Sequence, residues 1–153
     1  MLKNTIEAFE NHYDFIRSDQ FSLESNAVLK IVSDRLLSIG FKIELGKTIA
    51  DKIQVPVLFG LNGKVEKAFH ADGFHETGGV VIEVEAGRAL VNNQFLKDLF
   101  QACMMQDAHH LVIAVRSTYR GSDDFKKIVT FFDTLYASQR VILPLKSVLI
   151  IGY

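Results

Sequence analysis

The segment Val80-Val-Ile-Glu-Val-Glu-Ala86 constrains the fold of this chain more than any other. Its branched apolar residues predict a β-strand. Side chains alternate between the two faces of a strand, so Glu83 and Glu85 share one face, about 7 Å apart, while the apolar residues at positions 80, 82 and 84 share the other. Two neighbouring carboxylates repel each other unless solvent or a cation compensates. This face therefore either meets water or belongs to a site.

Hydrophobic periodicity predicts the other elements around this strand. In chain order they are a helix over 4–17, a helix from near Ser22 to Ile39, an undecided short strand within 41–45, a hairpin of 53–59 and 65–71, a loop with Gly73, Gly78 and Gly79, a helix capped by Asn92 or Asn93, a strand over 110–115, a helix opened by Asp123 or Asp124, and a strand over 147–151. From the second helix on, the order is α-β-β-β-α-β, followed by α-β. It predicts an α/β domain over 1–153 with a mixed central sheet flanked by helices.

Composition and charge narrow the class of protein further. Apolar residues make up 48% and charged residues 23% of the 153 positions, which is typical of a globular domain and excludes a disordered chain. The formal net charge is −1, from 17 basic and 18 acidic residues, which argues against a purely electrostatic nucleic-acid binder. We find no signal-peptide pattern, membrane-spanning run or nucleotide-cofactor motif. Because Cys103 is also the only cysteine, we expect a cytoplasmic protein. Cys103 lies in an apolar helical pattern, so we expect its thiol to lie in the core.

Asp72 adds a third carboxylate near the two glutamates. It ends the second strand of the predicted hairpin, and the glycine-containing loop that follows can bring it alongside Glu83. Three acidic side chains at strand ends form an oxygen-rich pocket of the kind that Mg²⁺ occupies. The alternative for Asp72 is an ordinary Asp-Gly turn residue.

With Asp72, ten intervening residues and then Glu83-Val-Glu85 on this order of elements, the chain resembles the PD-(D/E)XK nuclease superfamily. The resemblance covers about residues 22–115 and implies a restriction-endonuclease-like αβββαβ core, here with an extra N-terminal helix and a C-terminal α-β extension. It implies Mg²⁺- or Mn²⁺-dependent cleavage of DNA. Asp72, Glu83 and the backbone carbonyl of Val84 would hold the metal, which would activate a water.

Glu85 occupies the position where most members of this superfamily carry lysine. It resembles the BamHI variant of the motif, in which the glutamate is a metal ligand or a base. The missing lysine also leaves open the alternative that this protein has no catalytic activity. Lys97 on the following helix, or Arg88 directly after the strand, could supply the missing positive charge, and the alternative for both is a solvated surface cation. Glu24 is the nearest match to an additional acid from the first core helix, with a helix-terminal charge as the alternative.

Three classes of function therefore remain open. The first is a Mg²⁺-dependent endonuclease acting on DNA. The second is a non-catalytic binding or assembly module on the same fold, acting as a homodimer or with a partner, because the motif lysine is missing and 153 residues leave little room for base recognition. The third is an unrelated small-molecule enzyme or ligand-binding protein, in which Asp72 and Glu83 would lie far apart.

Overall fold

The computed structural model describes residues 1–46 and 48–153 and has a five-stranded sheet at its centre. The strand order is β1-β4-β5-β6-β9. The strands are β1 (Lys42–Ile43), β4 (Gly73–His75), β5 (Val80–Glu85), β6 (His110–Val115) and β9 (Ser147–Gly152). The first three are antiparallel neighbours, whereas β6 and β9 run parallel to β5. The sheet is mixed and flanked by helices, which confirms the predicted α/β class.

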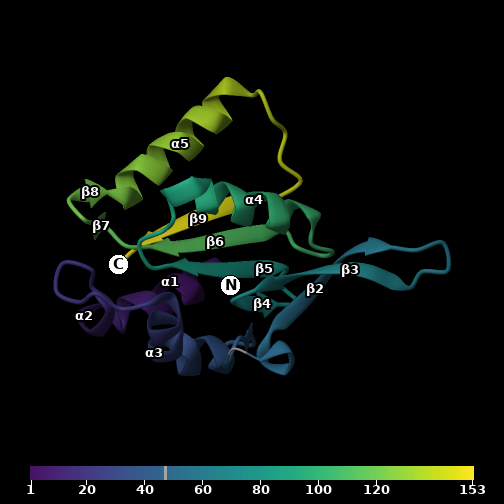
Figure 1. Cartoon of the computed structure of the whole chain (residues 1–153), viewed down its shortest axis with the longest axis horizontal. Coiled ribbons are helices and arrows are strands. Elements are labelled where there is room, and N and C mark those ends of the chain that lie inside the picture. Colours follow the sequence, from purple (N-terminus) through teal and green to yellow (C-terminus); the bar gives the residue numbers. More distant parts are fainter. Residues whose placement is uncertain (47) are drawn as a thin grey trace.

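Helices cover both faces of this sheet (Figure 1). One face carries α1 (Leu2–Glu10), α2 (Tyr13–Ile16) and α3 (Ser25–Ser38), and the other carries α4 (Gln94–Met104) and α5 (Asp124–Ser138). Short 3₁₀ helices span Ile49–Asp51 and Val91–Asn93. Within the described residues, no helix combines the length and the apolar character needed to cross a membrane.

Each face of the sheet has its own hydrophobic core, as the alternation of side chains in β5 requires. Val80, Ile82 and Val84 belong to the core beneath α1–α3, while Val81 belongs to the core beneath α4 and α5. Cys103 is half-buried and packs against this second core. Positions 83 and 85 share the face of position 81, so the two glutamates face α4.

The hairpin of β2 (Ile53–Phe59) and β3 (Val65–Ala71) forms a two-stranded sheet of its own and protrudes from the molecule (Figure 1). Its strands have the predicted bounds. The segment Gly73–His75 was expected to be loop, and this prediction was wrong, because it forms β4 and pairs with both β1 and β5. The chain thus leaves the hairpin through Asp72 and enters the central sheet at the next residue.

Three other elements differ from expectation in detail. The helix expected over 4–17 is interrupted after Glu10 and resumes at Tyr13. The helix expected from Ser22 begins at Ser25. Asn93 does precede α4, but it adopts a left-handed conformation and its side chain makes no capping hydrogen bond. By contrast, Asp123 caps α5 as predicted, since its carboxylate accepts a hydrogen bond from the Lys126 N–H at 2.9 Å.

Gly79 sets where β5 begins relative to β6. Its φ is +59°, and its carbonyl accepts hydrogen bonds from the N–H groups of His109 and His110 at 2.7 and 2.9 Å. A Cβ at this position would lie 2.4 Å from the carbonyl oxygen of Asp107, so only glycine fits. This junction fixes the parallel register in which Glu83 lies beside Ile113.

Candidate active site

Asp72 and Glu83 lie at corresponding positions on adjacent strands. In the antiparallel register of β4 and β5, Gly73 is opposite Ile82, so one step further Asp72 faces Glu83. Residues directly opposite each other have Cβ atoms about 4.5–5.5 Å apart. The regular ladder stops here, and Asp72 Oδ2 instead accepts a hydrogen bond from the Val84 N–H at 2.8 Å. This bond holds the Asp72 carboxylate against the strand that carries Glu83.

The α4 helix adds a fourth carboxylate to the three predicted ones. Asp98 is only 3% exposed, and its Oδ1 accepts a hydrogen bond from Gln94 Nε2 at 3.2 Å. Glu85 adjoins Asp98, and each of these two carboxyl groups changes the pKa of the other. All four carboxylates line one cavity of about 690 Å³ between the end of β5, the base of the hairpin and α4.

Burial raises the pKa of every acid in this cluster, because a carboxylate loses hydration there. Burial is the main cause in each case, and it brings the pKa of Asp72 and of Asp98 to about 6. Burial and then the charge of Asp72 raise the pKa of Glu83 well above its ordinary value. Burial and then Asp98 raise the pKa of Glu85 to about 8. The cavity thus holds more negative charge than its surroundings stabilise.

Few cations offset these acids in the described part of the chain. Lys97 lines the cavity, and its charge lowers the pKa values of Glu83 and Glu85, but the residue is exposed to solvent. Lys52 also lines the cavity, where its Nζ pairs with Glu44 Oε1 at 2.5 Å. Asp98 Oδ2 is buried without a hydrogen-bond partner. A bound cation would satisfy both the unpaired oxygen and the excess charge.

The donor atoms suit a hard divalent cation such as Mg²⁺. Among residues 1–46 and 48–153, no three His, Cys, Asp or Glu side chains are already arranged as a metal site. The candidate metal ligands are therefore two carboxylates and one backbone oxygen, namely Asp72, Glu83 and the Val84 carbonyl. The N–H and the carbonyl of one strand residue point to the same side of the strand. Since the Val84 N–H points toward Asp72, the Val84 carbonyl points toward the same side of β5.

The metal-free protein is expected to lose stability as the pH rises. The folded-state pKa values of about 6 and 8 exceed the ordinary values of 3.8 and 4.5. The folded chain therefore keeps protons that the unfolded chain releases, and the free energy of unfolding falls between about pH 5 and pH 8. We expect the Tm in EDTA to drop by roughly 5 °C over this range.

Two variants distinguish the effect of the carboxylate cluster on the pH dependence of the Tm from the effect of other titrating groups. Glu85→Gln should flatten the decline in Tm between pH 6 and pH 8, whereas Glu10→Gln on the exposed surface of α1 should leave it unchanged. His110, whose pKa burial lowers, contributes equally in both proteins and cancels in the comparison. A Tm that stays constant or rises from pH 5 to pH 8 in both variants and in the unmodified chain would refute the buried-acid account.

The residues singled out from the sequence divide between two neighbouring hollows. Asp72, Glu83, Glu85 and Lys97 line the carboxylate cavity. Arg88 and Glu24 line a second hollow, which also reaches Glu85. The third class of function required Asp72 and Glu83 to lie far apart, whereas the structure places both in one cavity.

Sequence reasoning missed two buried acids, Asp98 and Glu44. A signal for Asp98 was present, because it lies between Phe95 and Leu99, on the apolar face of α4. An acid among core positions of an amphipathic helix indicates a buried polar contact. Glu44 lies just past β1, where the sequence pattern was too short to interpret. The chain matches no family model, no curated protein and no solved structure with which it was compared.

Proposed function

We propose that the chain is a divalent-metal-dependent nuclease that hydrolyses phosphodiester bonds in DNA, with Mg²⁺ or Mn²⁺ as its cofactor. The observation that carries this proposal is the pairing of Asp72 with Glu83 across the end of the β4–β5 ladder, inside an acidic cavity. The hairpin of β2 and β3, which was expected to supply two core strands, forms a separate sheet. The central-sheet strands between α3 and α4 are instead β1, β4 and β5, and β6 follows α4, so an αβββαβ order remains when the hairpin is treated as an insertion, which supports the proposal.

Asp72, Glu83 and the Val84 carbonyl would hold the cation. When bound, such a cation lowers the pKa of a coordinated water and stabilises charge on the phosphate oxygens. The hydrogen bond from Val84 N–H fixes the Asp72 carboxylate in place before any ligand arrives. Glu83 is half-buried and lines the same cavity as Asp72, so both carboxylates border the space that a cation would occupy.

Glu85 and Lys97 have distinct roles in this proposal. Burial and the neighbouring Asp98 raise the pKa of Glu85, which favours the protonated form of Glu85 in the metal-free protein. A divalent cation nearby would favour its carboxylate form, in which an Oε atom can accept a proton from the attacking water. Lys97 extends from α4 at the cavity and would place its ammonium group near a phosphate oxygen.

A cleavage assay on single- and double-stranded DNA tests the proposal. Supercoiled plasmid and end-labelled oligonucleotides are incubated with the purified protein and Mg²⁺, Mn²⁺ or EDTA. We expect cleavage with at least one of the two cations and none in EDTA. Absence of cleavage on every substrate with both cations, by protein shown to be folded, would contradict an enzymatic function.

A second candidate is a non-catalytic binding or assembly module on the same fold. Glu85 favours it, because a carboxylate replaces the positive charge that the motif usually places near the reacting phosphate. We propose a homodimer as its form, in which the second copy would supply a recognition surface. Tight dimerisation measured by analytical ultracentrifugation, with no divalent-ion binding in calorimetry, would favour this module over the nuclease.

A further inference from the structure

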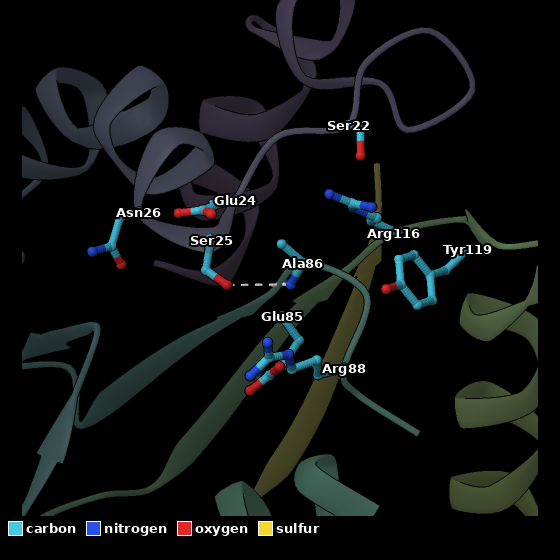
Figure 2. A pocket seen from close by; sticks show the side chains of 9 residues that line it. All are labelled: Ser22, Glu24, Ser25, Asn26, Glu85, Ala86, Arg88, Arg116 and Tyr119. Carbon is cyan, nitrogen blue, oxygen red and sulfur yellow. Dashed lines mark hydrogen bonds between the residues drawn. The ribbon is translucent and has the colours of Figure 1, made fainter. Parts of the chain in front are cut away.

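A second hollow of about 480 Å³ opens beside the carboxylate cavity (Figure 2). It lies where the parallel strands β5 and β6 end, since Ala86 and Arg116, the residues that follow these strands, both line it. Ligands of open α/β sheets commonly bind outside the carboxyl ends of the strands. The two hollows share Ser25, Asn26 and Glu85, so a ligand in one would adjoin a ligand in the other.

Arg116 gives this hollow a buried positive charge. The residue is 7% exposed, and its Nη2 donates a hydrogen bond to the Leu23 carbonyl. Its guanidinium stacks on the Tyr119 ring at 5.3 Å from the ring centre. Its Nε is buried without a hydrogen-bond partner, and none of the salt bridges of the described residues includes it. A buried guanidinium that lacks a carboxylate partner favours an anion beside it.

The N-terminus of α3 faces the same hollow. Ser25 and Asn26, the first two residues of this 14-residue helix, line it, and no described side chain caps the helix there. The N–H groups of Ala27 and Val28 bond to the Glu24 carbonyl, which leaves those of the first two residues for a ligand. Free N–H groups at a helix N-terminus bind phosphate and other anions.

Arg88 adds a second cation, and two acids oppose it. Arg88 extends into the hollow from the segment after β5 and is exposed (Figure 2). Glu85 lines this hollow as well as the carboxylate cavity, where it adjoins Asp98. Glu24 is exposed and is the acid nearest the free end of α3. The two arginines and the N-terminus of α3 thus supply positive charge to the hollow, and Glu24 and Glu85 act against them.

We propose that this hollow binds a phosphate group, held by the guanidinium groups of Arg116 and Arg88 and by the first N–H groups of α3. The inference rests on the proposed function only in that the phosphate would belong to a nucleic acid. The group is then either a terminal phosphate monoester or an internal phosphodiester of the strand. In both cases the site would position the strand relative to the carboxylate cavity.

Calorimetric titration with sodium phosphate in EDTA, at constant ionic strength, tests the site without cleavage or metal. We expect Arg88→Gln and Arg116→Gln each to weaken phosphate binding by about tenfold, the effect of losing a charged hydrogen bond. Glu24→Gln should strengthen binding, a change that a merely structural role would not produce. Arg140→Gln, at an exposed arginine after α5, is the matched control and should bind phosphate as the unmodified chain does.

Oligonucleotides then identify the source of the phosphate. Fluorescence anisotropy in EDTA compares single strands that differ only in a 5′-phosphate or a 5′-hydroxyl. Preference for the 5′-phosphorylated strand indicates a terminal monoester, and equal affinities that Arg88→Gln lowers indicate an internal phosphodiester. Binding of inorganic phosphate with no binding of either strand would support the phosphate site and contradict its assignment to the phosphate of a single nucleic-acid strand.

The inference is overturned if the unmodified chain binds no inorganic phosphate, or if Arg88→Gln and Glu24→Gln bind it as the unmodified chain does. Both of these residues are exposed, so their variants keep the test valid should Arg116→Gln fail to fold.

Discussion

Replacing Glu83 by glutamine is expected to reduce metal-dependent DNA cleavage by about 1000-fold or more, because metal ions contribute several kcal/mol of transition-state stabilisation. Glutamine keeps the shape of the side chain but removes the charge that Glu83 would offer to a cation opposite Asp72. The side chain is half-buried and its pKa is raised, so neutralising it removes an unfavourable charge from the folded state. Cleavage rates at saturating Mg²⁺ measure the effect.

Loss of cleavage counts only if the variant remains folded. We expect Glu83→Gln to unfold at the same or a higher temperature than the unmodified chain at pH 8. Glu10→Gln, at an exposed glutamate on α1, is the matched control and should cleave at the original rate. Equal cleavage by Glu83→Gln and the unmodified chain would show that any activity arises elsewhere.

Divalent cations should stabilise the protein strongly at pH 8. At 100 times its dissociation constant, a ligand specific for the folded state adds about 2.7 kcal/mol to the free energy of unfolding. For a chain of this size, this raises the Tm by roughly 5–10 °C. The shift should be smaller at pH 6, because the raised pKa values of Asp72 and Glu85 let protons compete with the cation. Thermal melts in MnCl₂ and in EDTA give the shift.

The same melts show where the cation binds. In Glu83→Gln the shift caused by Mn²⁺ should disappear, while Glu10→Gln should keep it. A shift of equal size in Glu83→Gln and the unmodified chain would place the ion away from the carboxylate cavity. No shift at all, up to the millimolar concentrations at which cells hold Mg²⁺, would argue for a non-catalytic module.

The sequence pattern was most informative where local composition decides the structure. The hairpin strands, β5 and β6 have the expected positions, since branched residues and turn glycines specify them locally. By contrast, β4 was missed, because its three residues begin with a glycine and become a strand only through pairing with β1 and β5. The break between α1 and α2 was missed because the apolar period runs on across it.

The site residues also divide into those that local sequence predicts and those that only tertiary packing brings together. Asp72 was predicted because its place at a strand end, with ten residues between it and Glu83, is visible in the sequence. Asp98 was missed because its carboxylate joins the cluster only through the packing of α4 on the sheet. Arg116 was missed because the segment before α3, which accepts its hydrogen bond, is 93 residues away in the chain. Contacts of this range depend on tertiary packing, which local patterns do not encode.

Diffraction from crystals soaked in MnCl₂ most directly tests whether the acidic cavity is a metal site. Data collected at a wavelength where manganese scatters anomalously locate the ion. We predict one strong anomalous peak, with carboxylate oxygens of Asp72 and Glu83 and the Val84 carbonyl oxygen each about 2.0–2.6 Å from it. A cavity without a peak, or a peak bound by other residues while Asp72 and Glu83 stay unligated, would contradict the account.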